Sequence, residues 1–158
     1  MTRACCEVLK RLSGKTLVTA ESLTGGGIGA ALTAVPGSSE VYKGGVISYT
    51  NWVKANLLGV PQELLNQYGA VSAPVAEAMA AGVREKLCAD VAVSVTGLAG
   101  PGGDAFGHPV GTVFIGYDDG RQSMVKQFRF SGSREEVRQR TVEAALKLVL
   151  ECNPMPEG

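Results

Sequence analysis

The chain has no excess of charge of either sign. Among its 158 residues, 15 are Lys or Arg and 15 are Asp or Glu, so the formal net charge is zero. This balance gives no indication of a basic surface for nucleic acid or of a membrane-binding face. The sequence also has no apolar run of about 18 residues, the length that a transmembrane helix needs. Because Glu7, Lys10 and Arg11 interrupt the amino-terminal segment, we expect no signal peptide and a cytoplasmic protein.

Patterns typical of metal sites and of histidine-based catalysis are missing as well. The cysteines match neither a zinc-binding nor a Cys-x-x-Cys spacing, and we expect reduced thiols at Cys5, Cys6, Cys88 and Cys152. His108 is the only histidine and lies in a segment rich in glycine and proline. One histidine without a His/Asp/Cys cluster argues against a zinc site and a histidine triad. We therefore predict no metal and no cofactor.

The clearest local motif is a turn rich in small residues over 19–27, with the sequence Thr-Ala-Glu-Ser-Leu-Thr-Gly-Gly-Gly. An apolar, β-prone run leads into it and an amphipathic segment follows it. A strand that turns sharply into a helix presents backbone N–H groups and the positive end of the helix dipole. The turn is neither a Walker loop nor a Gly-x-Gly-x-x-Gly fingerprint. Three interpretations stay open: it caps a helix, cradles a phosphate or holds a nucleophile.

Hydrophobic periodicity and turn residues predict alternating helices and strands. We expect helices over 3–13, 24–34, 52–58, 61–68, from 72 onward and from 133 onward, and strands over 16–20, 44–50, 90–96, 110–117 and 123–130. Asn51 and Ser72 are expected to cap their helices, and Ser133 and Glu136 to form a capping box. The order of elements predicts an α/β fold, a three-layer helix/sheet/helix sandwich with a mixed, mostly parallel sheet. We expect a single domain over residues 1–151 and a frayed tail over 152–158.

Polar side chains lie at the carboxyl ends of three predicted strands. Ser22 follows the first strand, Tyr49 closes the second and Thr96 closes the third. In open α/β sheets, sites form at this edge. Lys54 lies one helical turn beyond Tyr49, where partial burial beside a positive helix end would lower its pKa. A lysine perturbed in this way can accept a proton from a serine, as in Ser-Lys hydrolases.

Each of these residues also has a simpler interpretation. Ser22 could be the N-cap of the following helix, because serine is a preferred cap residue. Lys54 could be a solvated surface lysine, and the hydroxyl of Tyr49 could have only a backbone partner. Thr96 and Gly97 could form no more than a turn. The residues alone leave these alternatives open.

Two arginines near the start of the last predicted helix are further candidates. Arg134 lies angularly close to the apolar stripe that contains Val137 and Thr141, and Arg138 lies one turn further on. An arginine beside an apolar stripe suggests that it reaches an anion or a carboxylate. Surface ion pairing is the simpler interpretation.

Six blocks of sequence together resemble the CinA carboxy-terminal domain family. The resemblance covers nearly all of the chain, from about residue 4 to 150. The blocks occur in the order of that family: Ala20-Glu21-Ser22-Leu23-Thr24-Gly25-Gly26, Tyr49-Thr50-Asn51-Trp52-Val53-Lys54 before Leu58-Gly59-Val60, Gly69-Ala70-Val71-Ser72, Thr96-Gly97-Leu98-Ala99-Gly100-Pro101-Gly102-Gly103, Pro109-Val110-Gly111-Thr112-Val113 and Ser131-Gly132-Ser133-Arg134. The combination is specific, although no block is so by itself. Leu23 and Ser133 stand where Cys and Asp are common in the family.

The resemblance implies a nicotinamide-nucleotide amidohydrolase, which converts nicotinamide mononucleotide and water to nicotinate mononucleotide and ammonia in pyridine nucleotide salvage. It implies Ser22 as the nucleophile, Lys54 as its base and Tyr49 as the residue that assists them. It also implies a site threonine, Thr96, and a site arginine, for which Arg134 is the better match and Arg138 the fallback. A homodimer is expected on the same ground.

The implied reaction assigns roles to the two glycine-rich turns. Backbone N–H groups around Thr24, Gly25 and Gly26 are expected to form an oxyanion hole. The 5′-phosphate of the nucleotide substrate is expected to bind Arg134 or a glycine turn such as the one at Gly97. Two alternatives stay open: a non-catalytic regulatory module that binds a nucleotide with the same turns, and an amidohydrolase for another amide.

Overall fold

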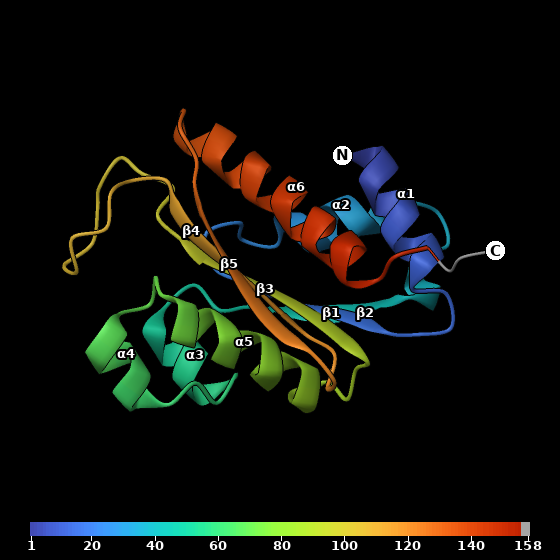
Figure 1. The fold of residues 1–158 in the computed structure, drawn as a ribbon, viewed down its shortest axis with the longest axis horizontal. Coiled ribbons are helices and arrows are strands. Elements are labelled where there is room, and N and C mark those ends of the chain that lie inside the picture. The colour runs from blue at the N-terminus through green and yellow to red at the C-terminus, as the bar shows by residue number, and fades with distance from the viewer. Residues whose placement is uncertain (156–158) are drawn as a thin grey trace.

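A five-stranded sheet forms the middle layer of the computed structural model, which describes residues 1–155 (Figure 1). The strands in chain order are β1 (Leu17–Glu21), β2 (Tyr42–Ile47), β3 (Val91–Gly97), β4 (Thr112–Asp118) and β5 (Ser123–Arg129). Their order across the sheet is β2-β1-β3-β4-β5. β1 is parallel to both of its neighbours, β2 and β3, whereas β3, β4 and β5 are joined by antiparallel pairings. The sheet is mixed, as the sequence predicts.

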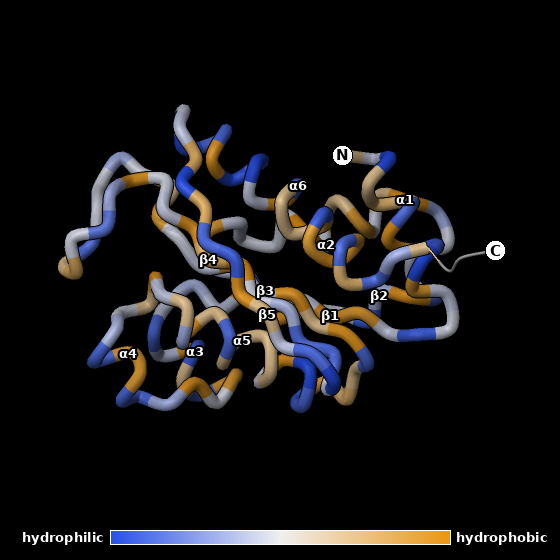
Figure 2. The backbone as a smooth tube through the Cα atoms, viewed as in Figure 1, coloured by the Kyte–Doolittle hydropathy of each residue, from blue (hydrophilic) through white to orange (hydrophobic). Residues whose placement is uncertain are grey.

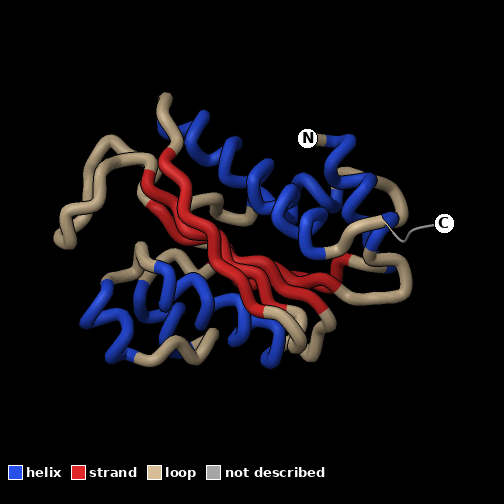
Figure 3. The backbone as a smooth tube through the Cα atoms, viewed as in Figure 1, coloured by secondary structure: helices blue, strands red, loops and turns tan. Residues whose placement is uncertain are grey.

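Helices cover both faces of this sheet (Figure 1 and Figure 3). One layer contains α1 (Thr2–Arg11), α2 (Gly27–Thr33) and α6 (Arg134–Cys152), and the other contains α3 (Asn51–Asn56), α4 (Gln62–Tyr68) and α5 (Ala73–Lys86). A short 3-10 helix, η1 (Ser38–Glu40), lies between α2 and β2. The predicted three-layer sandwich is therefore confirmed.

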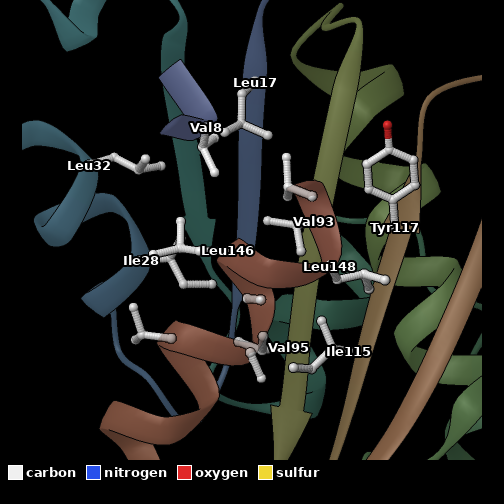
Figure 4. Packing of buried hydrophobic residues seen from close by; sticks show 14 of the residues in the cluster. Val8, Leu17, Ile28, Leu32, Val93, Val95, Ile115, Tyr117, Leu146 and Leu148 are labelled. Carbon is white, nitrogen blue, oxygen red and sulfur yellow. The ribbon is translucent and has the colours of Figure 1, made fainter. Parts of the chain in front are cut away.

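The two faces of the sheet contribute to two separate cores, because successive side chains of a strand point in opposite directions. Leu17 of β1 packs in a cluster with Leu146 of α6 (Figure 4), whereas Val18 packs in a cluster with Met79 of α5. All five residues of β1 are buried, as expected for an inner parallel strand with both faces covered. Figure 2 shows apolar segments gathered along the sheet between the helix layers.

The central place of β1 brings the segments that follow three strands to one edge of the sheet. Glu21 pairs with Ile47 on one side and with Val95 on the other. One residue further on, the Ser22 N–H donates to Val95 O at 3.1 Å, and the Ser48 N–H donates to Glu21 O at 2.7 Å. The meeting of these strand ends agrees with the sequence prediction.

Two helix caps differ from the prediction. Thr50, not Asn51, is the N-cap of α3, because its extended backbone places Oγ1 where it accepts a hydrogen bond from the Val53 N–H. Asn51 is the first residue of the helix instead. Ser72 does occupy the N-cap position of α5, but its Oγ donates to Gly69 O at 2.9 Å and accepts no hydrogen bond from the helix N–H groups.

The ends of β2 and of the chain also differ from the prediction. β2 stops at Ile47, so Tyr49 lies in the connection to α3 and does not close the strand. The capping box of Ser133 and Glu136 is present as predicted. α6 continues to Cys152, and Asn153 Nδ2 donates to the hydroxyl of a buried sheet tyrosine at 2.9 Å, which anchors this part of the chain. Cys152, where the expected tail starts, thus belongs to α6, and residues 156–158 of that expected tail lie outside the described residues.

Candidate active site

A tight turn over residues 22–26 connects β1 to α2. The Gly25 N–H donates to Ser22 O at 3.1 Å, which closes the turn. Gly25 and Gly26 have φ angles of 58° and 100°, in the left-handed region that favours glycine. Gly26 is the N-cap residue of α2. The interpretation of Ser22 as the helix cap is therefore wrong, and its side chain is free for another role.

A buried carboxylate, which the sequence analysis did not single out, takes over the capping of α2. Glu21 is 2% exposed, and its Oε1 accepts hydrogen bonds from the Ile28 N–H at 2.8 Å and from Thr24 Oγ1 at 2.6 Å. Its Oε2 accepts from the Gly29 N–H at 3.0 Å. A carboxylate at this position satisfies free N–H groups of the helix and opposes the positive end of its dipole. The only signal in the sequence was an acid at the end of an apolar strand, before a helix with no acidic first turn.

Glu21→Gln is expected to lower the free energy of unfolding by about 1–3 kcal/mol. The amide offers a single oxygen, and its NH2 group would face backbone N–H donors in a buried site. Urea unfolding of the variant and the wild type measures the difference. Glu77→Gln is the matched control, because Glu77 is exposed on α5 and its replacement is expected to change stability by less than about 0.5 kcal/mol. Equal effects of the two substitutions would contradict the capping role.

Lys54 is buried beside the turn over residues 22–26. Lys54 is 1% exposed. Its Nζ donates to Ser22 Oγ at 3.1 Å, to Ser48 O at 2.6 Å and to Tyr49 O at 3.4 Å. The two carbonyl contacts hold the amino group in place beside the serine. The interpretation of Lys54 as a solvated surface lysine is wrong, because packing of α3 against the sheet edge encloses the side chain.

Burial also changes the acid–base properties of this lysine. Removal from water disfavours the ammonium form and lowers the pKa of Lys54 from 10.5 to about 8. At pH 7 about one molecule in ten then carries a neutral Lys54. A neutral amine that lies within hydrogen-bond reach of a serine hydroxyl can accept its proton.

A cavity of about 510 Å³ opens beside Ser22 and Lys54. Six of the residues that the sequence analysis proposed line it: Ser22, Tyr49, Lys54, Thr96, Gly97 and Arg134. The other four proposed residues, Thr24, Gly25, Gly26 and Arg138, are not among the described residues that line it. The structure thus separates the residues that line the cavity from Thr24, Gly25 and Gly26, which belong to the turn, and from Arg138, which contacts the backbone of the turn.

Arg134 bridges two sides of the cavity. Its Nη1 donates to Gly100 O at 2.6 Å, and its Nη2 donates to the hydroxyl of Tyr49 at 3.2 Å. The hydroxyl of Tyr49 therefore faces Arg134, and within the described residues it forms no hydrogen bond with Ser22 or Lys54. Tyr49 supports Lys54 only through its backbone carbonyl.

Thr96 and Gly97 form the wall of the cavity at the end of β3. Because Glu21 pairs with Val95, Thr96 lies beside Ser22 at the next position of the neighbouring strand. Thr96 is buried, and its Oγ1 donates to Ala70 O at 2.8 Å, so the hydroxyl has a structural partner. A Cβ on Gly97 would lie 2.7 Å from Thr112 O, which explains why a glycine stands there.

Arg138 lies behind the turn. Its Nε donates to Leu23 O at 3.0 Å and its Nη2 donates to Thr24 O at 3.2 Å. Thr24 is itself fixed from the other side, where its hydroxyl donates to Glu21. A substrate in the cavity would meet Arg134, whereas Arg138 holds the backbone of the turn.

The segment over 98–111 contributes residues between Leu98 and Phe106 to the wall of the cavity, although none of them was a predicted site residue. Asp104 folds this segment back on itself, because Oδ1 accepts from the N–H groups of Phe106 and His108 and Oδ2 contacts His108 Nδ1 at 2.8 Å. Phe106 then packs against the backbone of Gly69, where a Cβ would lie 2.6 Å from the ring. His108 stabilises the loop through Asp104. The described residues that line the cavity include no histidine.

Comparison with known proteins decides the family. The sequence model of the CinA C-terminal domain matches residues 2–153. This chain belongs to the CinA C-terminal domain family. A CinA-like protein of Parasynechococcus marenigrum is 52% identical over 140 residues, which are 87% of this chain and 33% of that protein. A CinA-like protein of Mycolicibacterium paratuberculosis is 45% identical over 147 residues, which are 90% of this chain and 34% of that protein. The CinA domain thus spans about a third of the length of these curated relatives.

The CinA domain has the same fold as solved structures of competence/damage-inducible proteins. The competence damage-inducible protein A (ComA) from Klebsiella pneumoniae matches with a TM-score of 0.93 and 36% identity, over 95% of this chain and 94% of that one. The competence/damage inducible protein CihA from Agrobacterium tumefaciens matches with a TM-score of 0.93 and 37% identity, over 97% and 95% of the two chains. The fold and the family thus agree.

The described part of the CinA domain contains neither a cluster of metal-binding side chains nor a helix that could span a membrane. No group of three or more His, Cys, Asp or Glu side chains in residues 1–155 lies close enough together to hold a metal ion. None of the helices in this range combines the length and the apolar character that crossing a membrane requires.

Proposed function

We propose that this CinA domain is an amidohydrolase that converts nicotinamide mononucleotide and water to nicotinate mononucleotide and ammonia. The observation that carries the proposal is the 3.1 Å contact between Lys54 Nζ and Ser22 Oγ beside a cavity. A serine within reach of a buried lysine with a lowered pKa is the arrangement that a Ser-Lys hydrolase requires. The resemblance to nicotinamide-nucleotide amidohydrolases supports the choice of substrate.

In the first half of the reaction, neutral Lys54 accepts the proton of Ser22 while Oγ attacks the carboxamide carbon. The carbonyl π electrons move to oxygen and form a tetrahedral oxyanion, which backbone N–H donors of the turn stabilise. The intermediate then collapses and the C–N bond breaks. Lys54 gives its proton to the departing nitrogen, so that ammonia leaves and an ester joins Ser22 to the nicotinate group.

In the second half, water replaces ammonia. Lys54 is neutral again and takes a proton from a water molecule, which attacks the ester carbon. Collapse of the second intermediate breaks the bond to Oγ, and Lys54 returns the proton to Ser22. The products are nicotinate mononucleotide and the regenerated enzyme, and the dyad itself performs all proton transfers.

Arg134 is the best candidate for the 5′-phosphate of the substrate. It lines the cavity, and a guanidinium carries five N–H donors, so its contacts with Gly100 O and the Tyr49 hydroxyl leave donors free. The glycine-rich segment from Gly97 adds backbone that a phosphate can approach closely. We assign Tyr49 to this end of the cavity, because its hydroxyl faces Arg134.

The proposal also includes a cellular location and an oligomeric state for the enzyme. We place the reaction in the cytoplasm, which suits the four cysteines, all free thiols in the described part of the chain. We also expect a homodimer on the ground of the family resemblance.

Incubation with nicotinamide mononucleotide is expected to release one ammonia for each nicotinate mononucleotide formed, whereas free nicotinamide and glutamine are left intact. Coupled ammonia detection and chromatography of the nucleotides measure both products. Saturable binding of the mononucleotide without ammonia would favour the regulatory module instead. Hydrolysis of glutamine alone would favour an amidohydrolase for another amide.

The pH dependence of this activity is a second readout of the same proposal. The value of kcat/KM is expected to rise with pH and to level off above about pH 8, because Lys54 must be neutral to accept the proton of Ser22 and its pKa is about 8. Rates that stay constant between about pH 6 and 9 would contradict the role of Lys54 as the base.

A further inference from the structure

Arg138 contacts the turn from the side opposite to the substrate. Its two donors bind the carbonyl groups of Leu23 and Thr24, which follow Ser22 directly. The guanidinium borders a separate groove, together with Thr24, Gly27 and Val142, and does not border the active-site cavity. The proposed reaction assigns no role to Arg138, although its guanidinium binds the backbone of the turn that carries Ser22.

The geometry of a peptide unit links these carbonyls to the oxyanion. In a planar trans peptide, the C=O and N–H groups point in opposite directions. Because Leu23 O accepts a hydrogen bond from Arg138, the N–H of Thr24 in the same peptide unit points away from Arg138. Leu23, the other residue of this peptide unit, lines the active-site cavity beside Ser22. Within the described residues the Thr24 N–H has no hydrogen-bond partner, whereas the Gly25 N–H is bonded to Ser22 O.

We propose that Arg138 is a positioning residue, which orients the Leu23–Thr24 peptide so that the Thr24 N–H stabilises the oxyanion. The guanidinium charge also polarises this peptide and makes its N–H a stronger donor. Such a device is needed because Glu21 already opposes the positive end of α2, so the helix dipole offers little to an anion. The inference rests on the proposed function, since an oxyanion forms only when Ser22 attacks a substrate.

The test compares Arg138→Met and Arg138→Lys with the wild type. A fluorophosphonate phosphonylates the nucleophilic serine, because Oγ attacks phosphorus and fluoride leaves. This attack also needs oxyanion stabilisation, and mass spectrometry follows the attachment of the phosphonyl group to Ser22. Loss of one oxyanion donor lowers such rates by about 10²–10³-fold. We expect labelling of Arg138→Met to slow by about a hundredfold and that of Arg138→Lys by less than about tenfold, because lysine keeps the charge and one donor.

Kinetics with nicotinamide mononucleotide separate positioning from substrate contact. In Arg138→Met, kcat is expected to fall with the labelling rate while KM stays unchanged, because Arg138 does not line the cavity. In Arg138→Lys, the pH midpoint of kcat/KM is expected to stay near that of the wild type. Arg140→Ala is the matched control: Arg140 lies on the same helix and also donates to a backbone carbonyl, Ser131 O at 2.8 Å, and its loss is expected to leave both rates unchanged.

Each other outcome has a definite meaning. Wild-type labelling of Arg138→Met overturns the inference, and so does a rise of KM at constant kcat, which would make Arg138 a substrate contact. A shifted pH midpoint in Arg138→Lys also overturns it, because the whole site would then have changed. If the wild type itself is not labelled and releases no ammonia, the proposed function fails first.

Discussion

Lys54→Met is expected to lower ammonia release from nicotinamide mononucleotide by about 10³-fold or more. Methionine fills the same buried space but can neither accept the proton of Ser22 nor return it to the leaving nitrogen. The effect is expected in kcat, because Lys54 acts on the reacting atoms. Steady-state kinetics with the mononucleotide measure it. Retention of a tenth of the wild-type rate would exclude Lys54 as the base.

The same substitution is expected to remove a pH dependence of stability. The pKa of Lys54 falls from 10.5 to about 8 on folding, and each unit corresponds to about 1.4 kcal/mol. Between these pH values the unfolded chain holds more protons at this position than the folded chain, so the free energy of unfolding rises with pH. Below about pH 8 the buried ammonium destabilises the wild type by about 3 kcal/mol, and this cost disappears as the pH approaches 10.5.

Urea unfolding at about pH 7 and about pH 10 measures this effect as a difference between proteins. The wild type is expected to gain up to about 3 kcal/mol relative to Lys54→Met over this interval. Lys86→Met is the control, because Lys86 is exposed on α5. The free energy of unfolding of this variant is expected to change with pH as that of the wild type does. Parallel curves for the wild type and Lys54→Met would show that Lys54 titrates normally in the fold.

Ser22→Ala is expected to lower ammonia release by about 10⁴-fold or more, while binding of nicotinate mononucleotide stays within a few-fold of the wild type. The substitution removes one oxygen from the cavity and leaves the cavity residues Thr96 and Arg134 in place. Calorimetry with the product and a sensitive ammonia assay measure the two quantities. This combination of lost turnover and retained binding would separate an enzyme from a regulatory module.

Ser38→Ala is the matched control for this experiment. Ser38 and Ser22 are both 7% exposed, but Ser38 lies in η1 and is not among the described residues that line the cavity. Its loss is expected to leave ammonia release unchanged. A Ser22→Ala variant that releases ammonia at a rate close to that of Ser38→Ala would remove the proposed mechanism.

The fold was accessible from the sequence because its strongest signals are local. The buried strands β1 and β3 are apolar runs bounded by turn residues, and the capping box of Ser133 and Glu136 marks the start of α6. The caps of α3 and α5 were less accessible. Thr50 and Asn51 both suit a cap position, and only the backbone conformation at Thr50 selects between them.

The site was accessible only in part, because burial and reach are tertiary properties. The sequence alone favours a solvated Lys54, and the family resemblance was needed to pair it with Ser22, which is 32 positions away. The role of Arg138 depends on where α6 lies, because its carbonyl partners are more than a hundred residues earlier in the chain. Apart from the family resemblance, which favours Arg134, no pattern near Arg134 or Arg138 indicates which of them faces the cavity.

Glu21 also constrains the length of the turn that follows it. Its carboxylate binds the N–H groups of Ile28 and Gly29, so both ends of the segment that carries Ser22 are fixed to one side chain. Surface loops usually tolerate insertions and deletions. Here one added or deleted residue would rotate α2 against the carboxylate by about 100°. The segment between Glu21 and Gly27 is therefore fixed in length, unlike most surface loops.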